Sequence, residues 1–141
     1  MFNIDVDDKK FNKKLDEVID KLLPEAVMAG LTEAALLVEG SAKQKCPVDD
    51  GILRASITHY VEKDNAIIGT NTDYAPYTHE GTGIYATQGH GRMTPWRYQS
   101  SDGQWHTTEG QKPKPFLKEA IEENRKDILQ CFENKLGGDS V

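Results

Sequence analysis

The chain has 141 residues and a formal net charge of −6, from 17 Lys and Arg against 23 Asp and Glu. This length suits one domain with a real core, so we expect a single domain over residues 1–141. The acidic balance argues against a general nucleic-acid binder, and no run approaches the roughly 20 apolar residues that span a bilayer. Residues 1–14 lack the apolar core of a signal peptide. We therefore expect a protein made in a cytoplasm, without membrane contact and with Cys46 and Cys131 as reduced thiols.

The first part of the chain, residues 7–46, carries apolar side chains at three- and four-residue steps, which predicts helix. Asp7 or Asp8 can cap its start. Pro24 interrupts the pattern and either kinks one long helix or sits in the first turn of a second one. The helical part should end at Cys46, because a residue that precedes proline avoids the α region.

A change of period follows. Residues 53–61 alternate apolar and polar side chains, residues 63–65 supply turn formers, and residues 66–70 return as a second strand. This pattern predicts an antiparallel hairpin with one buried face. We expect the β part of the domain to span residues 51–112.

Residues 71–114 show no clear period and are rich in Gly, Thr, Tyr, His and Pro. Aromatic runs lie on either side of Ser100–Gly103, which predicts a second hairpin. We assign it to an insertion over residues 84–111, and we expect the insertion to project.

A last helix is predicted over residues 115–136, where apolar residues again recur at helical steps before a glycine pair. Strands between helices, joined as hairpins, indicate the α+β class. The expected fold is a small antiparallel sheet with the long N-terminal helix and the C-terminal helix packed on one face, plus the inserted hairpin.

Four histidines raise the alternative of a small metal-dependent hydrolase, built on His79, Glu80, His90 and His106. None of their spacings matches a zinc motif, and histidines in loops are more often solvated or hydrogen-bonded to the backbone. We therefore expect no metal and no cofactor at these residues.

The insertion gathers Trp96, Arg97, Tyr98 and Trp105. Such side chains can stack on bases, which keeps a nucleic-acid-binding accessory protein as a second alternative. Trp, Tyr and Arg also carry most of the binding energy at protein interfaces. In an acidic chain the protein interface is favoured.

Three segments together resemble a known family. The first joins Ala42–Lys43 to Pro47–Ile57, the second is Tyr74–Gly83, and the third is Lys114–Ala120. In this order they resemble the small tail components of long-tailed bacteriophages and prophages, which include head–tail joining, neck and tail-completion proteins. The resemblance spans about residues 36–136. The sequence departs from the usual motifs of this family at Asp50, Glu80 and Glu119.

The resemblance implies a structural protein without a catalytic site. It implies a place in the virion at the head–tail junction, after synthesis in the cytoplasm of the bacterial host. It also implies self-association into a ring, often six-fold in relatives, and contacts with other connector and tail proteins. The net negative charge of the chain would then let DNA pass through the channel of that ring without being held by it.

Two sets of residues are expected to serve this role. Loop and insertion residues are expected to contact partners: Tyr74, Tyr77, His79, Glu80, Trp96, Arg97, Tyr98 and Trp105. Turn and core residues are expected to shape the fold: Pro47, Asp49, Gly51, Leu53, Ile57, Gly81, Pro115 and Phe116.

Overall fold

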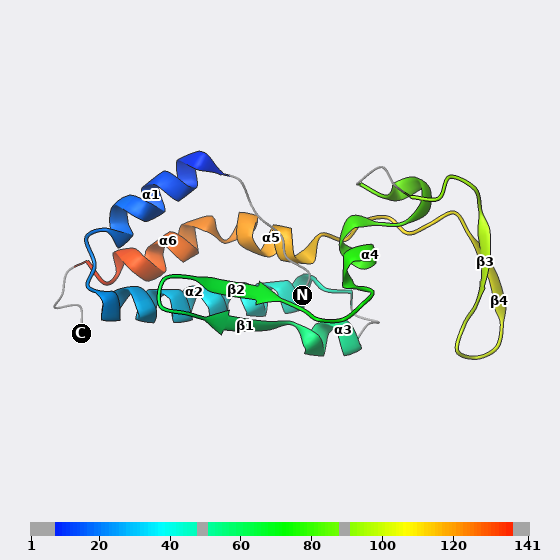
Figure 1. Ribbon diagram of the computed structural model, residues 1–141, viewed down its shortest axis with the longest axis horizontal. Coiled ribbons are helices and arrows are strands. Elements are labelled where there is room, and N and C mark those ends of the chain that lie inside the picture. Colours follow the sequence, from blue (N-terminus) through cyan, green and yellow to red (C-terminus); the bar gives the residue numbers. More distant parts are fainter. Residues whose placement is uncertain (1–7, 48–50, 88–90, 137–141) are drawn as a thin grey trace. The chain divides into compact units, whose positions relative to one another are not determined.

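The computed structural model describes residues 8–47, 51–87 and 91–136, and the chain divides into two compact units. Unit 1 joins Met1–Asn71 to Phe116–Val141, and unit 2 is Thr72–Pro115. Each unit combines helices with one two-stranded antiparallel sheet (Figure 1). The predicted α+β class is therefore confirmed. The prediction of one domain over the whole chain stays a prediction.

The N-terminal part of unit 1 forms two helices, α1 (Lys9–Ile19) and α2 (Pro24–Lys45). The side chain of Asp8 caps α1 by accepting a hydrogen bond of 3.1 Å from the amide of Phe11. Pro24 lies in the first turn of α2, where its missing N–H costs no hydrogen bond. Pro24 therefore sits in the first turn of a second helix and does not kink one long helix, which was the other alternative. No helix in the described part of the chain is long and apolar enough to cross a membrane.

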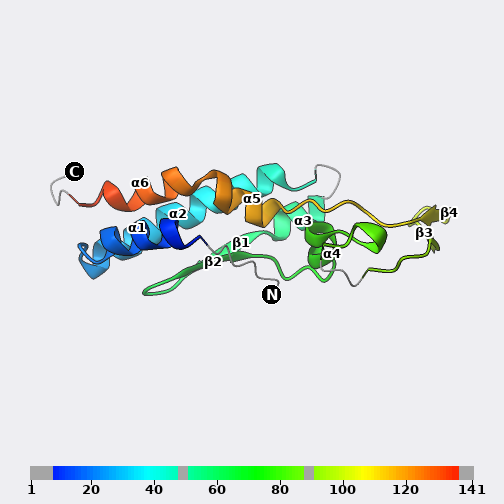
Figure 2. The same ribbon diagram turned by 90° about the horizontal axis from the view of Figure 1, so that it is seen from above.

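Helix α2 is the centre of unit 1. It packs against α5 (Phe116–Glu123), against α6 (Arg125–Glu133) and against the hairpin of β1 (Thr58–Val61) and β2 (Ala66–Gly69). Figure 2 shows α2, α5 and α6 on one side of this hairpin. Helix α1 packs on α6. The expected placement of N- and C-terminal helices on one face of a small sheet is confirmed.

The first predicted strand is partly wrong, because residues 51–56 form a short helix, α3 (Gly51–Ser56), and the strand begins only at Thr58. Leu53 and Ile57, which looked like two inward positions of a strand, are four residues apart and so also share one face of a helical turn. They are 0% and 1% exposed. The hydroxyl of Ser56 donates to the carbonyl oxygen of Leu53 at 2.7 Å, which satisfies the end of this turn.

The hairpin itself is confirmed. Tyr60 pairs with Ile67, and His59 pairs with Ile68. The ring of His59 is half-buried, and its Nδ1 lies 3.0 Å from a carboxylate oxygen of Glu39 in α2. This contact ties the hairpin to the helix that covers it.

The predicted C-terminal helix is interrupted at Asn124, which separates α5 from α6. The side-chain amide of Asn124 donates to the carbonyl oxygen of Ala120 at 2.7 Å, a position that the backbone N–H of Asn124 would fill in an unbroken helix. The same amide reaches the hydroxyl of Ser41 in α2 at 2.9 Å. Asn124 therefore breaks the helix and joins the break to α2.

The core of unit 1 consists of apolar side chains from α2, α5, α6 and the segment with α3 that precedes β1. They are Ala34, Ala35, Val38 and Ala42 of α2, Leu53 and Ile57, Phe116, Leu117 and Ala120 of α5, and Ile128 and Phe132 of α6. The alanines on α2 let the other elements approach its backbone closely.

Unit 2 contains α4 (Ala75–Glu80), the 3₁₀ turn η1 (Gly83–Tyr85), β3 (Trp96–Gln99) and β4 (Trp105–Thr108). Tyr74–Gly81 was expected as a loop, and most of it is helical instead, with Pro76 in the first turn. The predicted second hairpin is confirmed: Trp96 pairs with Thr108 and Gln99 with Trp105.

Two separate stretches of unit 2 run side by side at the base of this hairpin. The amide of Thr82 donates to the carbonyl oxygen of Gln111 at 2.9 Å, and the amide of Ile84 donates to that of Glu109 at 3.1 Å. Gly83 has φ +62°, and a Cβ there would overlap the carbonyl group of Glu109. Glycine at this position is what allows the two backbones to approach so closely.

Candidate partner-binding surface

Unit 2 contains a hollow of about 380 Å³ between α4, η1 and the start of β3. Its apolar walls include Pro76, Tyr77, Ala86 and Trp96, and its charged members are Glu80 and Arg92. A concave, mainly apolar surface with a few polar groups is typical of a binding site.

The carboxylate at this hollow is held by two neighbours. Nδ1 of His79 lies 2.9 Å from one oxygen of Glu80, and the hydroxyl of Thr87 donates to the other at 2.5 Å. His79 is 1% exposed, whereas the side chain of Glu80 is 23% exposed. His79 therefore positions Glu80, and Glu80 is the member of this pair that solvent or a partner can reach.

The hairpin of β3 and β4 presents aromatic side chains on both of its faces. Side chains alternate along a strand, so Trp96 and Tyr98 lie on one face and Arg97 and Gln99 on the other. The register places His106 opposite Tyr98, and these two rings stack with their centroids 5.3 Å apart. All residues of the two strands except the pair Trp96 and Thr108 at the base are exposed, which is unusual for an aromatic hairpin.

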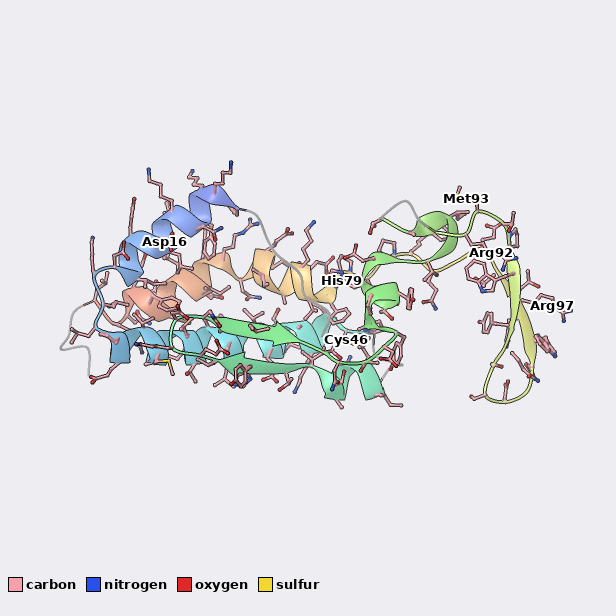
Figure 3. All side chains as sticks on the ribbon, viewed as in Figure 1. Asp16, Cys46, His79, Arg92, Met93 and Arg97 are labelled. Atoms are coloured by element: carbon pink, nitrogen blue, oxygen red, sulfur yellow. The ribbon has the colours of Figure 1, made fainter. Side chains whose placement is uncertain are left out.

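An arginine accompanies each tryptophan. The guanidinium carbon of Arg92 lies 5.8 Å from the centre of the Trp96 ring, and that of Arg97 lies 5.3 Å from the centre of the Trp105 ring. Figure 3 shows Arg92 on the side of the hairpin that faces α4 and η1, and Arg97 on the opposite side. The two Arg–Trp pairs thus lie on opposite faces, each worth about 0.5–1 kcal/mol as an exposed cation–π contact.

The predicted contact residues divide between these features. Tyr77, Glu80 and Trp96 line the hollow. Arg97 and Trp105 lie together on the far face of the hairpin, where Trp105 is 58% exposed. The remaining three of the set are Tyr74 at the start of α4, the buried His79, and Tyr98 on the Trp96 face.

The predicted structural residues lie at turns and in the core. Pro47 follows the end of α2, Gly51 begins α3, and Pro115 precedes α5, whose first residue Phe116 is fully buried. Gly81 ends α4 with φ +83°, a conformation that favours glycine. Asp49 lies outside the described residues.

His79 and His106, the described histidines of the alternative metal site, lie in different surroundings within unit 2. His106 lies on the hairpin beside Tyr98 and bonds to the hydroxyl of Ser100 at 3.0 Å, whereas His79 is buried beside Glu80. His90 lies outside the described residues. Within residues 8–47, 51–87 and 91–136, no group of three or more His, Cys, Asp or Glu side chains could hold a metal ion.

Pro76, Ala86 and Arg92 belong to the hollow but were not predicted as contact residues. Pro76 and Ala86 carry no chemistry that a sequence pattern would reveal. They line a binding surface only because α4, η1 and the strand that follows them are brought together in space.

Comparison with known families identifies a phage protein family. The family described as "Bacteriophage HK97-gp10, putative tail-component" matches residues 9–81, which is just over half of the chain and runs from the start of α1 to the end of α4. The β3–β4 hairpin lies beyond this match. Comparison with curated proteins and with solved structures finds no match. On the family match, the chain belongs to the HK97-gp10-like family of bacteriophage tail components.

Proposed function

We propose that this protein is a structural component of the head–tail junction, which assembles into a ring with copies of itself and binds the neighbouring connector and tail proteins. Membership of a phage tail-component family supports a structural role in the virion. The junction, the ring and its six-fold symmetry rest on the resemblance of the three sequence segments to joining and completion proteins.

Self-association is supported mainly by the exposure of the β3–β4 hairpin to solvent. Two four-residue strands without a covering layer are marginally stable in water. This hairpin nevertheless exposes Tyr98 by 47% and Trp105 by 58%. Trp, Tyr and Arg are the residues that dominate interface hot spots, so a partner that covers them would stabilise both the hairpin and the contact.

The proposed role needs no catalysis. The expected contact residues Tyr74, Tyr77, Glu80, Trp96 and Arg97 would act by packing and by charge. A ring of acidic subunits would not grip DNA, because the phosphate backbone is attracted by basic surfaces. DNA would therefore pass through the channel and leave it freely.

Deletion of the gene from its phage, followed by electron microscopy of the lysate, tests the proposal. We expect DNA-filled heads beside separate tails of normal length, because the joining step would be missing. Overlong tails would instead make the protein a tail terminator. Intact, infectious particles would contradict a structural role at the junction.

A further inference from the structure

The hollow and the exposed tryptophan lie on opposite faces of the same hairpin. Trp96 contributes a wall of the hollow and shares its face with Tyr98, whereas Trp105 shares the other face with Arg97. Residues that are directly opposite in an antiparallel pair point to the same side, which fixes this assignment. One face of unit 2 is therefore concave and apolar, and the other presents an indole ring.

Trp105 cannot fill the hollow of its own chain. It lies three residues before Thr108, the partner of Trp96, which is roughly 10 Å along the strand at about 3.3 Å per residue. Its side chain also leaves the hairpin on the face away from the hollow. Moving it there would require the strand to turn over and every cross-strand pair to be lost.

The indole and the hollow match in size and chemistry. The hollow of about 380 Å³ is large enough for one indole ring, and its walls at Pro76, Tyr77 and Trp96 are apolar or aromatic. Arg97 lies over the ring of Trp105 and would enter with it. The hollow carries one charge of each sign, and its cation, Arg92, lies over Trp96. The partly exposed carboxylate of Glu80 is the group that would attract the guanidinium group of Arg97.

Building on the proposed self-association, we propose that Trp105 and Arg97 of one copy occupy the hollow of a second copy of this chain. Each copy then offers two different surfaces, the hollow on one face of its hairpin and Trp105 on the other. Such a contact is heterologous: it repeats head to tail and closes into a ring when the rotation between copies permits.

The test uses two variants that each remove one side of the contact. Trp105→Ala removes the inserted ring and keeps the hollow. Tyr77→Ala opens a wall of the hollow and keeps Trp105; Tyr77 is 63% exposed, so the chain should still fold. The matched control is Tyr60→Ala in β1, whose side chain is 60% exposed and belongs to neither surface. Circular dichroism confirms folding of each variant, and sedimentation velocity gives the size of the assemblies.

The wild-type and Tyr60→Ala chains should self-associate alike, and each of the other two variants alone should associate roughly thirtyfold more weakly or worse, the size expected for a hot-spot aromatic. A mixture of Trp105→Ala and Tyr77→Ala should form heterodimers and nothing larger, because only one intact hollow and one intact Trp105 can meet. This rescue is specific to a head-to-tail contact.

Three results would overturn the inference. They are assembly of Trp105→Ala as in the wild type, a mixture that stays monomeric when the wild type assembles, and a wild-type chain that is monomeric at its highest soluble concentration. The last would point to a different tail protein as the occupant of the hollow. None of these three results would contradict the proposed role at the head–tail junction, which the gene deletion tests separately.

Discussion

The ring of Phe132 in α6 occupies the space in which any larger residue at position 30 of α2 would place its Cβ. An ideal Cβ on Gly30 would lie 2.6 Å from Cδ1 and 2.7 Å from Cε1 of that ring. Phe132 is 1% exposed, so its ring is surrounded and has little room to move. The bare backbone at Gly30 is therefore what lets α6 lie against α2.

Gly30→Ala should destabilise unit 1, although alanine is the better helix former by roughly 0.8–1 kcal/mol. Overpacking a tight core costs typically about 1–3 kcal/mol, which exceeds that gain. Gly40 lies in the same helix, and a Cβ there would have nothing within 4 Å, so Gly40→Ala should raise stability by roughly 0.5–1 kcal/mol. Urea unfolding of both variants should give shifts of opposite sign. Shifts of the same sign would contradict the packing of α6 on α2.

Gly83→Ala should loosen the base of the hairpin in unit 2. The residue has φ +62°, which costs a side chain about 1–2 kcal/mol, and its Cβ would also overlap the carbonyl group of Glu109. Gly103→Ala is the matched control, because Gly103 has φ +85° but its nearest neighbour is Gln99 Nε2 at 3.9 Å. Gly103→Ala therefore measures the cost of the positive φ angle without the overlap of a Cβ with a neighbouring backbone. Limited proteolysis should therefore cleave Gly83→Ala within unit 2 faster than Gly103→Ala, and equal rates would argue against the close approach.

The turn of the β3–β4 hairpin should show a characteristic response to acid. Hydrogen bonds from the hydroxyl of Ser100 and, at 3.1 Å, from the amide of Gln104 lower the pKa of Asp102. A carboxyl group whose pKa is lower in the folded state stabilises that state above its unfolded pKa of about 3.9, and this contribution is lost as the pH falls through the folded value. NMR titration should therefore place the midpoint of Asp102 below the ordinary aspartate value, which is about 3.9.

Ser100→Ala supplies the control for this titration, because it removes the hydrogen bond that lowers the pKa of Asp102 most. The midpoint of Asp102 should then rise toward the ordinary value. Two results would show that the turn lacks these hydrogen bonds. One is a wild-type midpoint at the ordinary aspartate value, and the other is a midpoint that Ser100→Ala does not change.

Cys131 should react slowly with alkylating reagents at neutral pH. Its burial, and then the negative charge of Glu33, raise the pKa of its thiol, and only the thiolate reacts. Glu33→Gln should lower that pKa and speed alkylation, since the nearby cation of Lys135 would lose its ion-pair partner at 2.6 Å and act more strongly on the thiol. Peptide mapping by mass spectrometry separates this site from Cys46, which is 2% exposed and should stay unmodified.

Glu25→Gln is the matched control for that experiment. Glu25 lies on the same helix as Glu33 but does not contribute to the pKa of Cys131. An equal acceleration by both substitutions would show that general charge, rather than Glu33, governs the thiol. The two cysteines are not joined by a disulfide, as the sequence predicted.

The parts of the fold that were predictable have strong local signals. The apolar period over residues 7–46 and the turn formers near Asn65 and Asp102 act within a few residues, so α1, α2 and both hairpins could be located. The end of α2 at Cys46 followed from Pro47 alone. The start of α2 was not predictable in the same way, because a proline at position 24 permits either a kink in one helix or the first turn of a second one.

The elements that were missed are short or depend on contacts distant in sequence. Helices α3 and α4 have six residues each, too few to separate a helical from an alternating pattern. The break at Asn124 depends on its side chain reaching both Ala120 and Ser41, and the second of these is 83 residues away.

The candidate surface was predictable in its residue types but not in its arrangement. Trp96, Arg97 and Trp105 stood out as interface residues from the sequence. That the two tryptophans point to opposite faces depends on the register of the hairpin, which pairs Gln99 with Trp105. The hollow depends on glycine-rich backbone crossings that no local pattern encodes.

The most direct test of the proposed assembly is a phage in which Trp96→Ala and Trp105→Ala replace the wild-type residues together. Both side chains are at the surface of the hairpin, so the purified double variant should stay folded by circular dichroism. We predict that electron microscopy of the lysate shows DNA-filled heads apart from normal tails, and no infectious particles. Infectious particles at the wild-type titre would contradict the claim that the β3–β4 hairpin makes the contact on which assembly depends.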